Sequence, residues 1–216
     1  IGYDGGYGYN KIQGVVDDVR IYDRALSKEE ISALYRLESP NHFAEMNSTV
    51  DLEMIWVQPG TFTMGQNGVA SPVHEVNLSK GFYLGKYEVT QAQYEAVMSG
   101  NDNGLSATPS EWPNNPHRPV ESVSWHNVQV FLGRLNQQEA SFLPEGWAYV
   151  LPTEAQWEYA CRAGTTTSYS WGETITAVDA NWDHGEDENQ TVDVGQYGAN
   201  PWGFHNMHGN VREWTA

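Results

Sequence analysis

The residues of this chain with the clearest chemical potential lie in its C-terminal segment, residues 200–216. This segment contains amide and carboxylate oxygens, those of Asn206 and Glu213 among them, between glycine and tryptophan residues. Neither a helical nor an alternating apolar period runs through it. We therefore predict a tight, aromatic-walled loop that holds a ligand.

Two histidines of the same segment, His205 and His208, raise the question of a transition-metal site. No cysteine partner and no His-Glu-x-x-His helix accompanies them, so we interpret their spacing as coincidental. The chain also has no Gly-x-Ser-x-Gly elbow and no glycine-rich phosphate loop. Hydrolase and nucleotide-binding functions therefore gain no support.

Cys161 is the single cysteine of the chain. It falls on the apolar face of a predicted helix, beside Trp157 and Ala160, which favours a small core residue over a nucleophile. A single cysteine cannot form an internal disulfide, and it leaves the redox compartment open.

Local signals predict the helices that must position these residues. Thr90 and Thr153 each begin a capping box, which predicts helices near 91–99 and 154–163. Apolar residues at helical spacing predict a third helix near 125–137.

Strands are expected upstream of these helices. The apolar runs 54–57 and 62–64 flank Pro59-Gly60, which predicts a hairpin, and a further strand is predicted over 82–89. After Gly164 no convincing long helix follows, so the remainder is predicted to be irregular structure held by turns, aromatic residues or ions.

The first part of the chain has a different pattern. Residues 12–23 alternate like a half-buried strand, and the capping box at 27–30 predicts a short amphipathic helix. One strand and one helix cannot bury a core. Residues 37–52 carry turn-forming residues without a period, which predicts a linker.

Composition limits the classes of partner. The chain has 11 basic and 28 acidic residues and a net charge of -17, which repels the phosphate backbone of nucleic acids. Charged residues make up 18% and aromatic residues 12%, so the chain is globular with an acidic surface. Its apolar runs are far shorter than the about 20 residues that span a bilayer. We expect neither a nucleic-acid partner nor a membrane span.

Five segments resemble, in the same order, the formylglycine-generating enzyme / sulfatase-modifying factor family. They are residues 56–65, 83–91, 118–125, 151–164 and 209–214. The resemblance implies an α+β fold over residues 53–216, a variant of the C-type lectin fold with little regular secondary structure. Residues 1–36 resemble the C-terminal end of a laminin-G-like, concanavalin A-like sandwich, which implies the remnant of an all-β jelly roll.

The family resemblance also implies bound calcium. The first implied ligand set is Asn206, Gly209, Val211 and Glu213. The second is Asn181, Trp182, Asp187 and Asn189. Calcium prefers such mixtures of carboxylate, amide and carbonyl oxygens. The second loop is not an EF-hand, because Val194 stands where that motif needs a glutamate. The alternative, a turn-capping Asn206 and a solvated Glu213, stays open.

Two functions follow from the resemblance. In the family's oxidases, two cysteines after an Arg-Gly-Gly-Ser-Trp motif bind copper and convert a sulfatase cysteine to formylglycine. Neither that motif nor a second cysteine occurs here, so we expect an incomplete domain, with copper only if a missing C-terminal part supplies the pair. The other hypothesis is a calcium-stabilised, lectin-like accessory module that binds a carbohydrate or surface ligand. The laminin-G-like neighbour suggests an extracytoplasmic location for either one.

Overall fold

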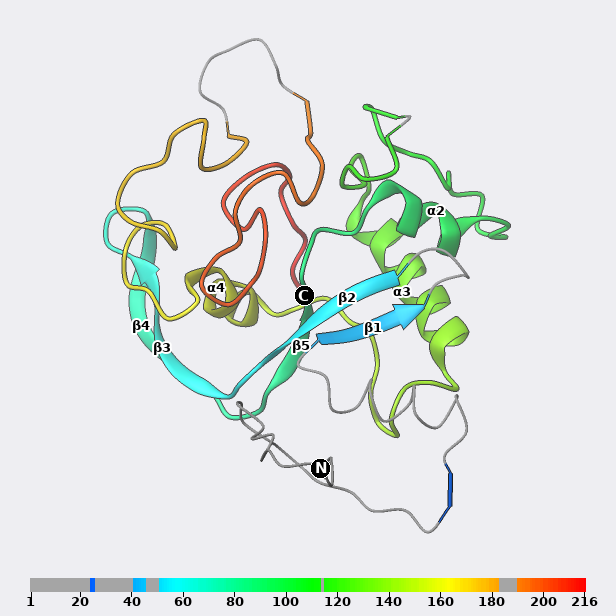
Figure 1. Ribbon diagram of the computed structural model, residues 1–216, viewed down its shortest axis with the longest axis horizontal. Helices are drawn as coiled ribbons and strands as arrows, with labels where there is room; N and C mark the ends of the chain where they lie inside the picture. Colours follow the sequence, from blue (N-terminus) through cyan, green and yellow to red (C-terminus); the bar gives the residue numbers. More distant parts are fainter. Residues whose placement is uncertain (1–23, 26–40, 46–50, 114, 183–189) are drawn as a thin grey trace, which may run out of the picture.

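The computed structural model describes residues 24–25, 41–45, 51–113, 115–182 and 190–216. This part of the chain forms two small antiparallel sheets and three helices (Figure 1). It is a small mixed helix-and-sheet fold. The strand and the helix predicted within residues 1–36 lie outside the described residues, and so does the jelly-roll remnant that they would form.

The larger sheet has three strands: β1 (Asn41–Glu45), β2 (Asp51–Val57) and β5 (Phe82–Gly85). Its order is β1-β2-β5, with both pairs antiparallel. β1 lies within the segment predicted to be a linker, so regular structure begins earlier than the sequence pattern indicated. β5 ends at Gly85, several residues before the predicted end of this strand.

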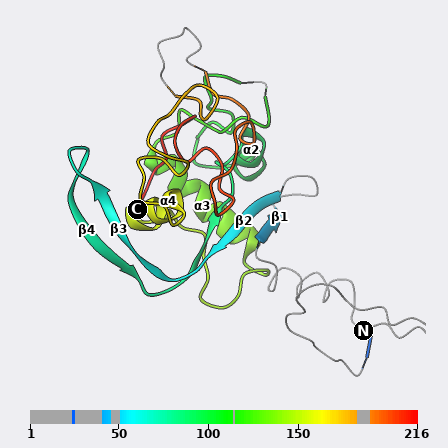
Figure 2. The same ribbon diagram turned by 60° about the vertical axis from the view of Figure 1, so that its left-hand side comes forward.

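The second sheet is a two-stranded hairpin of β3 (Gly60–Gln66) and β4 (Ala70–Leu78), which curves away from the rest of the fold (Figure 2). The hairpin predicted through Pro59-Gly60 is therefore wrong, because β2 and β3 pair in different sheets. Gly60 packs directly on the Tyr159 hydroxyl, where a Cβ would collide. The chain thus passes against a helix at this point instead of folding back on β2.

The three helices are α2 (Gln91–Met98), α3 (Trp125–Glu139) and α4 (Glu154–Arg162), close to the predicted bounds. Each begins with a complete capping box, made by Thr90, Ser124 and Thr153 with the residue three positions later. These caps satisfy backbone N–H groups that a first helical turn leaves unpaired. Local sequence therefore determines where each helix begins.

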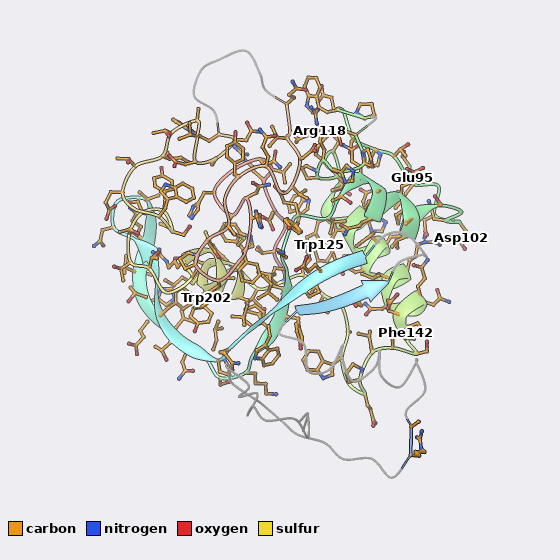
Figure 3. The ribbon with its side chains drawn as sticks, in the orientation of Figure 1. Glu95, Asp102, Arg118, Trp125, Phe142 and Trp202 are labelled. Carbon is orange, nitrogen blue, oxygen red and sulfur yellow. The ribbon has the colours of Figure 1, made fainter. Side chains whose placement is uncertain are left out.

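Two hydrophobic clusters form the core. The first joins α2 to α3 and includes a stacked pair, Tyr94 and Phe131, with ring centroids 5.4 Å apart. The second joins α4 to the C-terminal segment: Phe204 is 1% exposed, and the Trp202 ring meets Tyr159 edge-on at 4.9 Å, beside α4 (Figure 3). The irregular segment is thus anchored in the core.

The described residues after Gly164 form no helix and no extended strand, as predicted. In Figure 1 this segment, coloured orange to red near the C-terminus, fills the space between α4 and α2. Side-chain amides hold it: Asn200 accepts hydrogen bonds from the N–H groups of Trp202 (3.0 Å) and Phe204 (3.1 Å) and donates to the Ala160 carbonyl (2.8 Å). None of the helices described is long and apolar enough to cross a membrane.

Candidate cation site

A buried carboxylate, Glu88, lies between β5 and α2 and faces the C-terminal segment. Its Oε2 accepts hydrogen bonds from the side-chain amides of Asn206 (2.8 Å) and Asn210 (3.3 Å). Its Oε1 is buried and has no hydrogen-bond partner among the described residues. Glu88 is only 8% exposed, and this burial raises its pKa to about 8. An unpaired oxygen on a buried acid is costly unless a proton or a cation satisfies it.

The turn that faces Glu88 has an unusual backbone. Asn206 and Asn210 have φ angles of 55° and 68°, in the left-handed region that asparagine tolerates better than most residues. Asn206 is buried and also donates to the Val194 carbonyl at 3.0 Å. The Gly209 N–H donates to the Asn206 carbonyl (3.2 Å), and the Val211 N–H donates to the Gly209 carbonyl (2.9 Å).

A second acid shares this space. Glu88, Val211 and Glu213 all line one large open cleft of about 1980 Å³. The Glu213 side chain is accessible from the cleft, and desolvation by the groups packed around it raises its pKa to about 7. The charge of Glu213 also contributes to the raised pKa of Glu88. The two carboxylates therefore repel each other across the same region.

The chemistry of these residues is compatible with a hard cation. The donors are carboxylate, amide and carbonyl oxygens, the mixture that calcium prefers. The Glu88 Oε1 has no hydrogen-bond partner among the described residues, so either a proton or a cation could satisfy it. Within the described part of the chain, no three His, Cys, Asp or Glu side chains form a metal cluster, so a cation here would depend on amide and carbonyl oxygens. We call Glu88, Asn206, Gly209, Val211 and Glu213 the candidate cation site.

Sequence reasoning missed Glu88. It lies 118 residues before Asn206, in a run that was predicted to be a strand. The available signal was an acidic residue inside an apolar run, immediately before the Val89-Thr90 start of α2. Such a residue is buried when the run packs into the core.

The second predicted ligand set lies partly beside the first. The Asn181 carbonyl accepts a hydrogen bond from the Asn210 N–H at 2.7 Å, and the Asn181 amide donates to the Gln190 carbonyl at 3.0 Å. Trp182 follows as a partly exposed residue. Asp187 and Asn189 lie outside the described residues.

The two histidines of the motif do not meet. The His205 Nδ1 donates to the Tyr197 carbonyl at 2.8 Å, and its ring packs on Tyr87. His208 instead packs against Cys161, with the Sγ 3.6 Å from Nε2 and 3.8 Å from Nδ1.

Cys161 is a core residue, as predicted. It is 6% exposed, and burial raises its pKa to about 12, so the reactive thiolate is disfavoured. Burial lowers the pKa of His208 to about 4, and its Nε2 accepts a hydrogen bond from the Ser170 N–H at 3.1 Å. Because the thiol is buried and the His208 Nε2 already accepts the Ser170 N–H, this pair is not placed to attack a substrate from solvent.

Comparison with known proteins gives a consistent result. The profile of the "Sulfatase-modifying factor enzyme 1-like domain" matches residues 40–216. The "Chaperone protein LppX" of Paenibacillus barcinonensis is 32% identical, with 78% of this chain and 72% of that protein covered. The "Formylglycine-generating enzyme" of Mus musculus is 26% identical over 76% of this chain and 58% of its own length. Among solved structures, PvdO from Pseudomonas aeruginosa superposes with a TM-score of 0.69 at 25% identity, over 83% of this chain and 75% of that one.

Proposed function

The chain belongs to the sulfatase-modifying factor enzyme 1-like domain family, and from this premise we propose that it is the calcium-stabilised scaffold of a formylglycine-generating type of protein. In its complete form this protein would oxidise a cysteine of a sulfatase polypeptide to formylglycine. The named activity of relatives such as the mouse enzyme supports this proposal, and so does the order of the motifs along the chain.

The single observation behind the calcium part of the proposal is the unpaired, buried Oε1 of Glu88. The candidate cation site would hold the ion through the carboxylates of Glu88 and Glu213, the amide oxygen of Asn206 and the carbonyls of Gly209 and Val211. Its role is structural, because a loop without regular hydrogen-bonded structure loses much conformational entropy on folding and a bound dication offsets that loss.

Copper does not fit the residues present. The oxidase chemistry of the family needs two cysteines, whereas this chain has only Cys161, whose thiol is buried under His208. A copper centre would require cysteines from outside residues 1–216, because the single thiol within them cannot supply the pair.

The lone thiol leads to the first prediction. Incubation of this chain with copper and a cysteine peptide of sulfatase type is expected to leave the peptide mass unchanged. A buried thiol with a pKa of about 12 cannot replace a pair of accessible cysteines. Mass spectrometry is the measurement, and formation of the aldehyde would show that Cys161 is not inert.

A second candidate function is a non-catalytic, lectin-like accessory module that binds a carbohydrate or a surface ligand. A relative whose name denotes no oxidase, the "Chaperone protein LppX", supports it. In either case we propose an extracytoplasmic location, where calcium is abundant. A pair of copper-binding cysteines elsewhere in the whole protein would favour the oxidase over this accessory module.

The second prediction tests calcium binding. The melting temperature of the purified protein is expected to rise with free calcium, because the ion binds only the folded state. The gain in the free energy of unfolding is about 2.7 kcal/mol at one hundred times Kd. Calorimetry in calcium and in a chelator measures this shift.

Three Glu→Gln variants, each of which removes one negative charge, show which carboxylate the calcium-dependent rise in melting temperature depends on. Glu213→Gln should abolish most of the calcium-dependent shift, while Glu145→Gln, in an exposed turn outside the candidate cation site, should leave it intact. Glu188→Gln, in the acidic segment 183–189, should matter less than Glu213→Gln. If calcium does not change the melting temperature of the wild type, the calcium proposal fails, and Asn206 and Glu213 are an ordinary turn residue and an ordinary surface residue.

A further inference from the structure

The Asn210 side chain makes four hydrogen bonds that join the C-terminal segment to Glu88 and to residues earlier in the chain. Its Oδ1 accepts from the Val192 N–H (2.8 Å) and from the Asn181 amide (3.2 Å). Its Nδ2 donates to the Val192 carbonyl (3.1 Å) and to the Glu88 Oε2 (3.3 Å). An asparagine amide has two donor hydrogens and two acceptor lone pairs, so its capacity is fully used.

The backbone strengthens the same connection. The Asn210 N–H donates to the Asn181 carbonyl at 2.7 Å, and the neighbouring Gly209 packs against that peptide group so closely that a Cβ would collide with it. Asn181 in turn donates to the Gln190 carbonyl. Asn210 therefore links the candidate cation site to Asn181 and Val192.

We propose that Asn210 is a positioning residue that couples cation binding at the candidate cation site to the ordering of Asn181 and residues 190–192. This inference rests on the proposed calcium function. Asn210 shares the Glu88 Oε2 with the predicted ligand Asn206. A cation that fixes Glu88 and the turn 206–213 also fixes Asn210, and the side-chain bonds of Asn210 then hold Val192.

Coupling of this kind is reciprocal. If cation binding orders the segment around Val192, ordering of that segment strengthens cation binding by the same factor, so loss of the connecting Asn210 side chain should weaken cation binding. Couplings between sites in proteins commonly lie between about 5-fold and 150-fold. A side chain that only stabilised the fold would lower the melting temperature without changing the affinity for calcium.

Asn101 provides the matched control for such a structural role. Its amide also makes four hydrogen bonds: to the carbonyls of Met98 and Leu105 and from the N–H groups of Asn103 and Leu105. None of these partners belongs to the candidate cation site. Asn101→Ala therefore removes a similar set of bonds in a different part of the domain.

The test combines calcium titration calorimetry with hydrogen exchange at the Val192 N–H, which is bonded to Asn210. The test variant is Asn210→Gly, because glycine accepts the φ of 68° and only the side-chain bonds are lost. In the wild type, calcium is expected to slow Val192 exchange at least about 5-fold. Asn210→Gly should remove that effect and weaken calcium binding by a similar factor, whereas Asn101→Ala should retain both the affinity and the protection.

The outcomes separate the two proposals. If the wild type gives no calcium heat, the calcium function fails, and the inference fails with it. If calcium binds but hydrogen exchange at the Val192 N–H does not change, only the coupling is overturned. This measurement uses the wild type alone, so it tests the coupling even if Asn210→Gly does not fold. Equal calcium affinities for Asn210→Gly and the wild type would also overturn it.

Discussion

Replacing Gly209 with alanine is expected to destabilise the domain by roughly 2 to 4 kcal/mol, from overpacking together with the loss of a backbone hydrogen bond. An added Cβ would collide with the Asn181 carbonyl oxygen and would lie 3.0 Å from its carbonyl carbon. Both atoms belong to the backbone, so no side chain can move aside. Because that carbonyl accepts the Asn210 N–H at 2.7 Å, relief of the clash must break this bond.

Gly133→Ala is the control, because it makes the same chemical change at a glycine with open space around it. Gly133 lies inside α3, and a Cβ added there would meet no atom of another segment within 4 Å. Alanine there should stabilise the protein by up to about 1 kcal/mol through helix propensity. Urea denaturation measures the change in the free energy of unfolding for both variants. A Gly209→Ala midpoint equal to that of the wild type would show that the two segments do not pack this closely.

The sequence predicted the helices well because their signals are local. The capping boxes at Thr90 and Thr153 lie within four residues of the structure that they start, and the apolar spacing after Ser124 defines the buried face of α3. Burial of Cys161 followed from the same spacing. Such features need no knowledge of the rest of the fold.

Strand pairing could not be predicted in the same way. Pro59-Gly60 has the composition of a hairpin turn, but the partners of β2 and β3 are chosen by contacts with distant segments such as α4. A turn signal shows where the chain changes direction, not which strands pair. β1 was missed because turn-forming residues surround it and its partner, β2, supplies the pairing.

The candidate cation site was predictable only where its residues are neighbours. The turn 206–213 is one contiguous motif, whereas Glu88 reaches Asn206 and Asn210 across 118 and 122 residues. A single acidic residue next to a predicted strand gives no indication of its partners. Its burial, which leaves the Oε1 without a hydrogen-bond partner among the described residues, exists only in the folded protein.

That burial leads to the last prediction, on pH. In calcium-free protein, the free energy of unfolding is expected to fall as the pH rises towards 8. The pKa of Glu88 is raised from 4.5 to about 8 on folding, mainly by burial. Between these values the folded state holds a proton that the unfolded state has lost, so each rise in pH favours unfolding. Glu213, with its pKa raised to about 7, acts in the same direction.

His208 opposes this trend at lower pH. Folding lowers its pKa from 6.5 to about 4, so between those values the unfolded state binds the extra proton and stability rises with pH. Above pH 6.5 its imidazole is mostly neutral in both states. Between about pH 6.5 and 8 the change in stability therefore comes mainly from the two acids. Across this window Glu88 alone should lower the free energy of unfolding by roughly 2 kcal/mol.

Calorimetric or urea unfolding at several pH values within this window, in a chelator, tests the prediction. Glu88→Gln should flatten the decline, because an amide does not titrate, while Glu145→Gln should leave the slope unchanged. Added calcium should reverse the trend in the wild type, since the ion replaces the proton and binds more tightly once the carboxylates are charged. A wild-type profile that is flat in chelator from pH 6.5 to 8 would show that Glu88 is already ionised throughout this window, which contradicts the predicted effect of its burial.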